Sequence, residues 1–165
     1  MRDDRDQTMA LVAAEIPQFV SATVLLQVAI ADQLGVPVSD LHCLNLVQAG
    51  AATTPTQIAE RMGMTTGAVT KMLDRMEQQR LVRREPDPVD RRRVVVRPLD
   101  DRAADLAELY QPMVRYLGEQ MDRSTTAELR YLAGFVRAGR EAAVKETLRI
   151  RRGGKPHPTR RPRGE

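Results

Sequence analysis

The segment from Glu85 to Leu99, EPDPVDRRRVVVRPL, places three consecutive arginines between an acidic turn and three valines. Guanidinium groups at the tip of a short hairpin can enter a narrow groove with a negative potential, and the minor groove of DNA is such a groove. A merely solvated turn would have the same composition. Because side chains alternate along a strand, Arg92 should point opposite to Arg91 and Arg93, with Asp90 on the side of Arg92.

A second candidate surface lies on the segment just before the hairpin. From Thr66 to Gln79 the apolar residues Val69, Met72, Leu73 and Met76 follow one helical stripe, and the other face carries small and cationic residues. Such a face can enter a major groove and donate hydrogen bonds to base edges, although a plain solvated helix would look similar. The predicted contact residues of this helix are Thr65, Thr66, Gly67, Thr70, Lys71 and Arg75. The methionines Met62, Met64, Met72 and Met76 are interpreted as core residues.

A third candidate is the pair His42 and Cys43. Both are most simply ordinary residues of a helix, and the alternatives are that His42 lines a ligand cavity or that Cys43 senses oxidants. A single cysteine excludes an internal disulfide and favours a reducing compartment, which we take to be the cytoplasm. The sequence has no phosphate loop, no metal-ligand spacing and no evident nucleophile with its base. We therefore predict no enzymatic activity, no cofactor and no metal.

These candidate residues need elements to position them, and the pattern predicts helices nearly everywhere. The first, Thr8 to Gln33, is read as a buried helix and not as a membrane span, because its uncharged run from Ile16 to Ala31 is too short to cross a membrane. Pro17 can kink this helix. Thr54 to Gln57 form a capping box that opens a helix to about Met62, which Gly63 ends. The remaining predicted elements are a helix from Ser39 to Gln48 capped by Ser39, strands from Leu81 to Glu85 and Val94 to Leu99, and helices from Asp100 to Met121 and Thr125 to Arg149, the last opened by the capping box Thr125 to Glu128.

The charge is distributed unevenly along the 165 residues, whose formal net charge is +4. Residues 54–99 carry 10 bases and 6 acids, so the middle third is the cationic part of the chain. The predicted division is residues 1–53 as N-terminal dimerisation and support helices, residues 54–99 as a winged helix-turn-helix lobe, residues 100–149 as C-terminal dimerisation helices, and residues 150–165 as a disordered basic tail. The tail is either a solvated end or a non-specific phosphate contact.

The stretch IAERMGMTTGAVTKMLDRMEQQRLVRREPDPVDRRRVVV resembles the MarR family of bacterial transcriptional regulators, chiefly in V-T-x-x-x-D-R-M-E, L-V-x-R and D-P-x-D-R-R. The resemblance implies a homodimer paired through the outer helices and release by a small phenolic or aromatic ligand. It also makes residues 66–75 the recognition helix and Arg92 the wing arginine, whose guanidinium Asp90 can hold in a fixed direction.

This sequence departs from the family pattern in two places. Arg80 stands where the family usually has glycine, so Arg80 must take a positive φ or the helix must end differently. Leu99 and Arg102 replace the threonine and glycine that follow the second wing strand, and Asp100 is then the expected cap of the next helix.

From these observations we predict a mainly α protein that binds double-stranded DNA as a homodimer and does not contact a membrane. It is expected to be a repressor with a palindromic operator whose half-sites lie about 34 Å apart, one helical turn. A winged helix used for protein contact and a non-specific DNA-coating protein remain alternatives.

Overall fold

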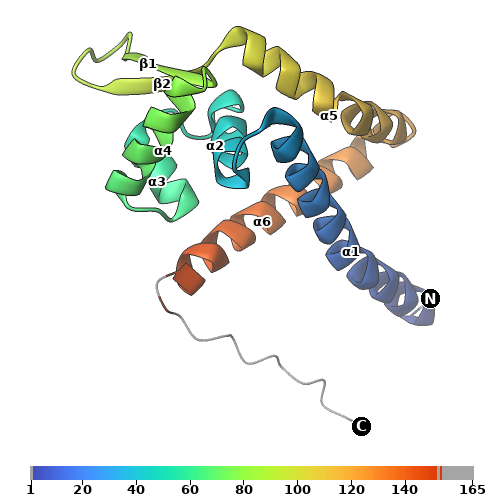
Figure 1. Cartoon of the computed structure of the whole chain (residues 1–165). Helices are drawn as coiled ribbons and strands as arrows, with labels where there is room; N and C mark the ends of the chain where they lie inside the picture. The colour runs from blue at the N-terminus through green and yellow to red at the C-terminus, as the bar shows by residue number, and fades with distance from the viewer. Residues whose placement is uncertain (1, 152, 154–165) are drawn as a thin grey trace.

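The computed structural model describes residues 2–151 and 153, with the side chains described from Asp4 onward. It is mainly helical with a two-stranded wing, which confirms the predicted fold class (Figure 1). The elements are α1 (Arg2–Leu34), α2 (Val38–Gln48), α3 (Pro55–Met62), α4 (Thr66–Gln78), β1 (Val82–Pro86), β2 (Val94–Pro98), α5 (Asp100–Met121) and α6 (Thr126–Arg151). All lie within a few residues of the predicted segments.

Helices α2, α3 and α4 pack with the β1–β2 hairpin around one apolar core, and we call this unit the reader lobe. Its fully buried side chains include Leu41, Leu44, Ile58, Val69, Met72, Leu73, Met76, Leu81 and Val96. The predicted stripe of α4 is therefore confirmed, and three of the four predicted core methionines are buried, while Met64 packs at the edge of the core. Burial of this stripe fixes which face of α4 points outward.

Local signals set the ends of the lobe helices as predicted. The Thr54 hydroxyl accepts the backbone N–H of Gln57, and the Gln57 side chain accepts the backbone N–H of Thr54, so the capping box is complete. Gly63 ends α3 with φ +61°. Arg80 takes φ +57°, the left-handed conformation that its position requires, and lets the N–H of Leu81 bond to the carbonyl of Met76.

Two predicted caps were wrong. Pro37, with φ −60°, precedes the first residue of α2, and the Ser39 hydroxyl donates instead to Asp40 Oδ1 at 3.0 Å. Leu99 occupies the cap position of α5, which places Asp100 inside the first turn. A carboxylate there still interacts favourably with the positive end of the helix dipole.

The terminal helices have little burial within the chain. The prediction that α1 is buried was wrong for a single copy, because its large apolar side chains from Met9 to Leu25 are exposed, as is Val28, and only its last turns, from Leu26 onward, reach the lobe core. Helix α6 has no buried residue.

By length and composition α1 is also apolar enough to cross a membrane, within Asp4–Leu34. The uncharged run counted from the sequence understated this property, because a membrane span tolerates a charge or two near its ends. A soluble helix that is apolar on all sides meets the same criterion when it is buried in an assembly.

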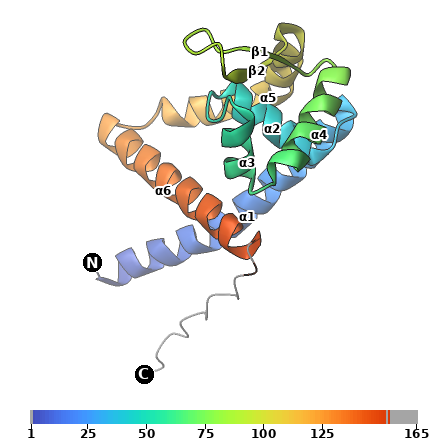
Figure 2. The ribbon, with the colours of Figure 1, turned by 90° about the vertical axis from the view of Figure 1, so that its left-hand side faces the viewer.

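Helix α5 leads away from the reader lobe and α6 returns toward it, so the end of α6 lies beside the α3–α4 turn (Figure 2). Leu148 and Arg151 approach so closely that a Cβ added at Gly63 would lie 3.0 Å from an atom of each. The Thr125–Glu128 capping box opens α6 as predicted. The helix includes residues 150 and 151, which were predicted to belong to the tail, and the rest of that tail except Gly153 lies outside the described residues.

Candidate nucleic-acid interface

The outward face of α4 begins at Thr65, whose hydroxyl accepts the backbone N–H of Ala68 at 3.3 Å and caps the helix. Thr66, Gly67, Thr70 and Lys71 are exposed. A Cβ added at Gly67 would meet nothing within 4 Å, so this surface is open. The first turns of α4 therefore present hydroxyl groups and one ammonium group without bulky side chains, a shape suited to a groove.

Further along α4, Arg75 forms a two-pronged ion pair with Asp40 of α2. Its Nε donates to Asp40 Oδ2 at 2.8 Å and its Nη2 to Asp40 Oδ1 at 2.6 Å. The hydrogen bonds that Arg75 donates to Asp40 raise the pKa of the Arg75 guanidinium. The Asp40 side chain is fully buried, whereas that of Arg75 stays 44% exposed. Arg75 therefore lies on the flank of α4 that faces α2.

The wing is fastened to α4 through Arg84 of β1, a residue that the sequence analysis missed. Its Nη1 donates to Asp74 Oδ1 at 2.8 Å and to Glu77 Oε2 at 2.5 Å, and its Nη2 donates to the Thr70 carbonyl at 3.2 Å. Asp74 and Glu77 belong to the D-R-M-E motif and Arg84 to the L-V-x-R motif, so these motifs were the sequence signal for this contact.

The tip of the wing is shaped by two aspartates. Asp87 Oδ1 accepts the backbone N–H groups of Val89 at 2.8 Å and Asp90 at 3.3 Å, and these bonds lower the pKa of the Asp87 carboxyl. Asp90 Oδ1 accepts the backbone N–H of Arg92 at 3.1 Å. In the described structure the Asp90 carboxylate therefore holds the backbone of Arg92 and not its guanidinium, which corrects our prediction of that contact.

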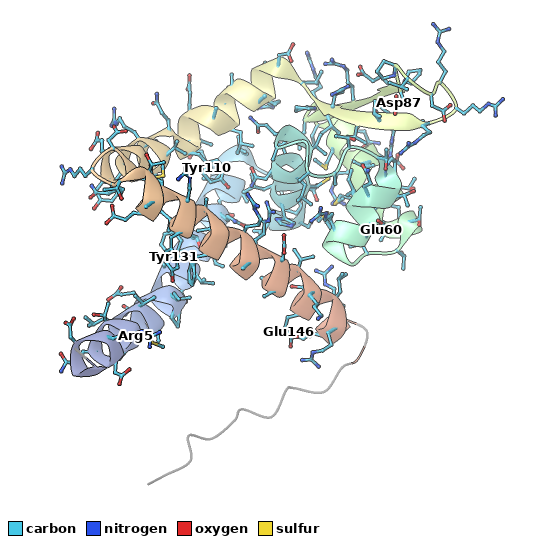
Figure 3. All side chains as sticks on the ribbon, turned by 180° about the vertical axis from the view of Figure 1, so that it is seen from behind. Arg5, Glu60, Asp87, Tyr110, Tyr131 and Glu146 are labelled. Atoms are coloured by element: carbon cyan, nitrogen blue, oxygen red, sulfur yellow. The ribbon has the colours of Figure 1, made fainter. Side chains whose placement is uncertain are left out.

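The three wing arginines Arg91, Arg92 and Arg93 are exposed, and their guanidinium groups make no hydrogen bond or ion pair with any residue that the structure describes. At the base of the wing Glu85 accepts from Arg97 at 3.0 Å and from Arg83 at 3.2 Å, and these two bonds lower the pKa of Glu85. The wing loop, where Asp87 lies, and α4 occupy the side of the reader lobe that faces away from α1 (Figures 1 and 3).

A cavity of about 400 Å³ lies between α2 and α5, on another side of the reader lobe. Its walls are mostly apolar, and Asn45 Nδ2 donates to the Tyr110 hydroxyl at 3.1 Å at its edge. The lining residues are Asn45, Gln48, Ala49, Leu106, Ala107, Tyr110, Gln111 and Val114. His42 and Cys43, which we predicted as possible pocket residues, are not among the residues that line this cavity.

The two α2 candidates differ from each other in exposure. His42 is exposed, and partial desolvation and the charge of Arg151 lower its pKa. Cys43 is fully buried, and desolvation, with a smaller effect of Asp40, raises its pKa to about 12. Since the thiolate is the reactive form, Cys43 lacks the properties of an oxidant sensor. Among the described residues, no group of three or more His, Cys, Asp or Glu side chains is arranged to hold a metal ion.

Comparisons with known proteins agree with this geometry. The family model described as "MarR family" matches residues 34–93, which span α2 to the wing. The HTH-type transcriptional regulator YcgE of Bacillus subtilis is 31% identical over 129 residues, covering 78% of this chain and 84% of YcgE. The multiple antibiotic resistance protein MarR of Escherichia coli is 27% identical over 95 residues, covering 58% of this chain and 66% of MarR.

Solved structures show the same fold. The crystal structure of wild-type E. coli MarR in its apo form gives a TM-score of 0.51 at 23% identity, over 74% of this chain and 91% of that chain. A MepR mutant from Staphylococcus aureus gives 0.63 at 14% identity, over 79% and 96%.

Proposed function

Since the chain belongs to the MarR family of helix-turn-helix transcriptional regulators, we propose that it is a repressor that binds a palindromic operator as a homodimer. Regulators of this family bind DNA and are not enzymes. The observation that carries the proposal is the combination of an open α4 face with a wing whose three arginine guanidinium groups make no hydrogen bond or ion pair with a described residue. A regulator with two such readers related by a two-fold axis occludes the DNA it covers, which is the simplest route to repression.

Contacts with bases are proposed for the first turns of α4, and contacts with the minor groove for the wing. The α4 residues proposed for base contact are Thr65, Thr66, Gly67, Thr70 and Lys71. Arg75, on the flank of α4 that faces α2, is also proposed to contact the DNA. The wing set is Asp90, Arg91, Arg92 and Arg93. Within the wing, Asp90 acts by shaping the loop, because its carboxylate accepts the Arg92 backbone N–H. The cationic side chains supply the salt-dependent part of the affinity.

The homodimer is supported by the terminal helices. Exposed apolar side chains run along α1, and others lie on α5 and α6. A soluble protein rarely leaves so large an apolar surface uncovered. The long outer helices of two copies can cover one another, and a two-fold axis then sets the distance between the two reader lobes. Such an assembly is a cytoplasmic protein and leaves no apolar helix for a membrane.

Release by a small aromatic or phenolic effector is proposed for the α2–α5 cavity. Its volume of about 400 Å³ and apolar walls suit one ring, and Asn45 and Tyr110 offer polar groups at the edge. The cavity lies between the reader lobe and a helix that leads to the proposed dimer contacts. A ligand that favours one spacing of the lobes must antagonise DNA reciprocally.

The test is to recover genomic fragments on the purified protein and to footprint them. A sequence-specific dimer should protect a short palindrome with half-sites about one helical turn apart. Binding without a footprint would identify a non-specific coating protein. The absence of salt-dependent DNA binding would instead identify a winged helix used for protein contact.

A further inference from the structure

Asp40 is a buried carboxylate in a lobe that is otherwise apolar inside. Thr54 is the other buried polar residue among those described. Oδ1 of Asp40 accepts from Arg75 Nη2 and from the Ser39 hydroxyl, while Oδ2 accepts from Arg75 Nε. A carboxylate without water is costly unless it is paired and hydrogen-bonded. The Asp40–Arg75 pair is therefore a fixed part of the lobe.

The pairing uses one edge of the Arg75 guanidinium. A guanidinium has five N–H groups in a rigid plane, and Asp40 takes the Nε hydrogen and one Nη2 hydrogen. The opposite edge, made of Nη1 and the second Nη2 hydrogen, makes no hydrogen bond to a described residue. That edge matches two oxygens of one phosphate group.

Arg84 is the internal comparison. Its side chain is 24% exposed, and both of its Nη atoms donate to acceptors on α4. Arg84 therefore uses three of its five N–H groups within the chain, and its side chain is more buried than that of Arg75. Arg75 is 44% exposed, and its ion pair leaves three of its five N–H groups available.

We propose that Asp40 is a positioning residue that holds the open edge of Arg75 toward a phosphate of the operator backbone. This inference rests on the proposed function. A phosphate is favoured over a base because Arg75 lies on the α2-facing flank of α4, and phosphates line the two rims of the groove that a recognition helix enters. A flexible arginine loses rotamer entropy when it binds, whereas one already held by a buried carboxylate loses less.

An Asp40–Arg75 ion pair that only stabilises the packing of α2 against α4 would show the same contacts. The experiment therefore needs a measurement that such a structural role does not affect. That measurement is the slope of log affinity against log salt concentration, which counts the phosphates neutralised by cations. Operator affinity is measured across salt concentrations for the wild-type protein and for R75A, R75K, D40N and the R75A/D40N double variant. Circular dichroism and thermal melting give the folded fraction of each.

We expect R75A to bind operator about ten-fold more weakly and to lower the magnitude of the salt slope by about 0.9. R75K keeps the positive charge, but an ammonium group cannot bond to both Asp40 oxygens and also offer two N–H groups to a phosphate. R75K should therefore lose most of the operator affinity that R75A loses. D40N should weaken binding in the wild-type background and add nothing in the R75A background. Arg102→Ala is the matched control, because Arg102 pairs with Asp105 at 3.2 Å on α5, outside the interface.

Three results would overturn the inference. If R75A has the wild-type salt slope and operator affinity at an equal folded fraction, the ion pair has only a structural role. If R75K has wild-type affinity, the direction in which the Arg75 guanidinium is held does not matter for binding. Additive losses in R75A/D40N would separate the two residues. If D40N fails to fold, the R75K result decides alone, since Arg75 is half exposed. A wild-type protein that gives no operator footprint would contradict the proposed function itself. If R92A loses operator binding while the Arg75 variants keep the wild-type affinity, only this inference is contradicted.

Discussion

The reader lobe and the terminal helices differ in how they cover their apolar side chains. In the lobe, α2, α3, α4 and the wing strands bury their apolar side chains against one another. Helix α6 buries none, and α1 buries residues only near its end. The lobe therefore buries its apolar surface within one chain, while the terminal helices leave theirs exposed, which is why we propose that a second copy covers them. Stability of the lobe and assembly of the proposed dimer should respond to different mutations, and five experiments test this division.

The largest effect should come from the lobe core. Leu73 is fully buried in α4, so Leu73→Ala should lower the free energy of unfolding by about 2–5 kcal/mol. Denaturant unfolding measures the change. Leu132 of α6 is 44% exposed and serves as the control, measured in a monomeric background. An equal loss for Leu132→Ala there would show that α6 is part of the lobe core after all.

The next effect should appear in assembly. Phe19 of α1 is 56% exposed in the single chain, and a charge placed there would be buried in the proposed dimer. Phe19→Asp should weaken dimerisation by about 3 kcal/mol, more than 100-fold, which light scattering over a dilution series detects. Val89→Asp is the control, because Val89 is 94% exposed at the wing tip and lies outside the outer helices. If the wild-type protein is a monomer at micromolar concentration, the proposal that a second copy covers the terminal helices is refuted.

The third effect should be confined to DNA binding. Arg92→Ala should weaken operator binding by roughly 1–3 kcal/mol, because it removes a groove contact. The dimer and the melting temperature should stay unchanged, since the guanidinium has no partner within the described structure. Fluorescence anisotropy of labelled operator measures the affinity, and a lower melting temperature would mean that Arg92 supports the lobe.

Asp90→Ala should cost less affinity than Arg92→Ala. Because the Asp90 carboxylate holds a backbone N–H in the loop that also carries Arg91 and Arg93, its removal should still weaken binding once Arg92 is absent. A double-mutant cycle decides the point. Complete loss of the Asp90 effect in the Arg92→Ala background would restore a direct action on the guanidinium.

The smallest effect concerns pH. Burial raises the pKa of the Cys43 thiol from 9.0 to about 12, so the unfolded chain ionises first and the folded lobe loses stability as pH rises between these values. Between pH 9 and pH 10 the loss should be about 1 kcal/mol relative to a Cys43→Ser variant. The native thiol should also resist a thiol reagent at neutral pH. Rapid labelling of the native protein would show that α2 opens readily.

Local features of the reader lobe were predictable from the sequence. The Thr54 capping box and the apolar stripe of α4 each depend on residues within one or two turns, whereas the sequence left open whether Arg80 takes the positive φ that the structure shows. The Asp40–Arg75 pair joins residues 35 positions apart, and no periodicity reports such a contact. The burial of α1 was misjudged for a related reason, because composition tells that a helix must be covered but not which chain covers it.

The close packing of α6 against Gly63 has a mechanical consequence. The chain leaves the reader lobe along α5, turns, and comes back along α6 to rest on the turn before the recognition helix (Figure 2). Lobe, α5 and α6 thus form a closed triangle, and a triangle cannot change one angle without changing another. In the proposed dimer, we expect bending at the α5–α6 corner to tilt α4, so the helices proposed to join two protomers would also set the angle at which each one meets DNA.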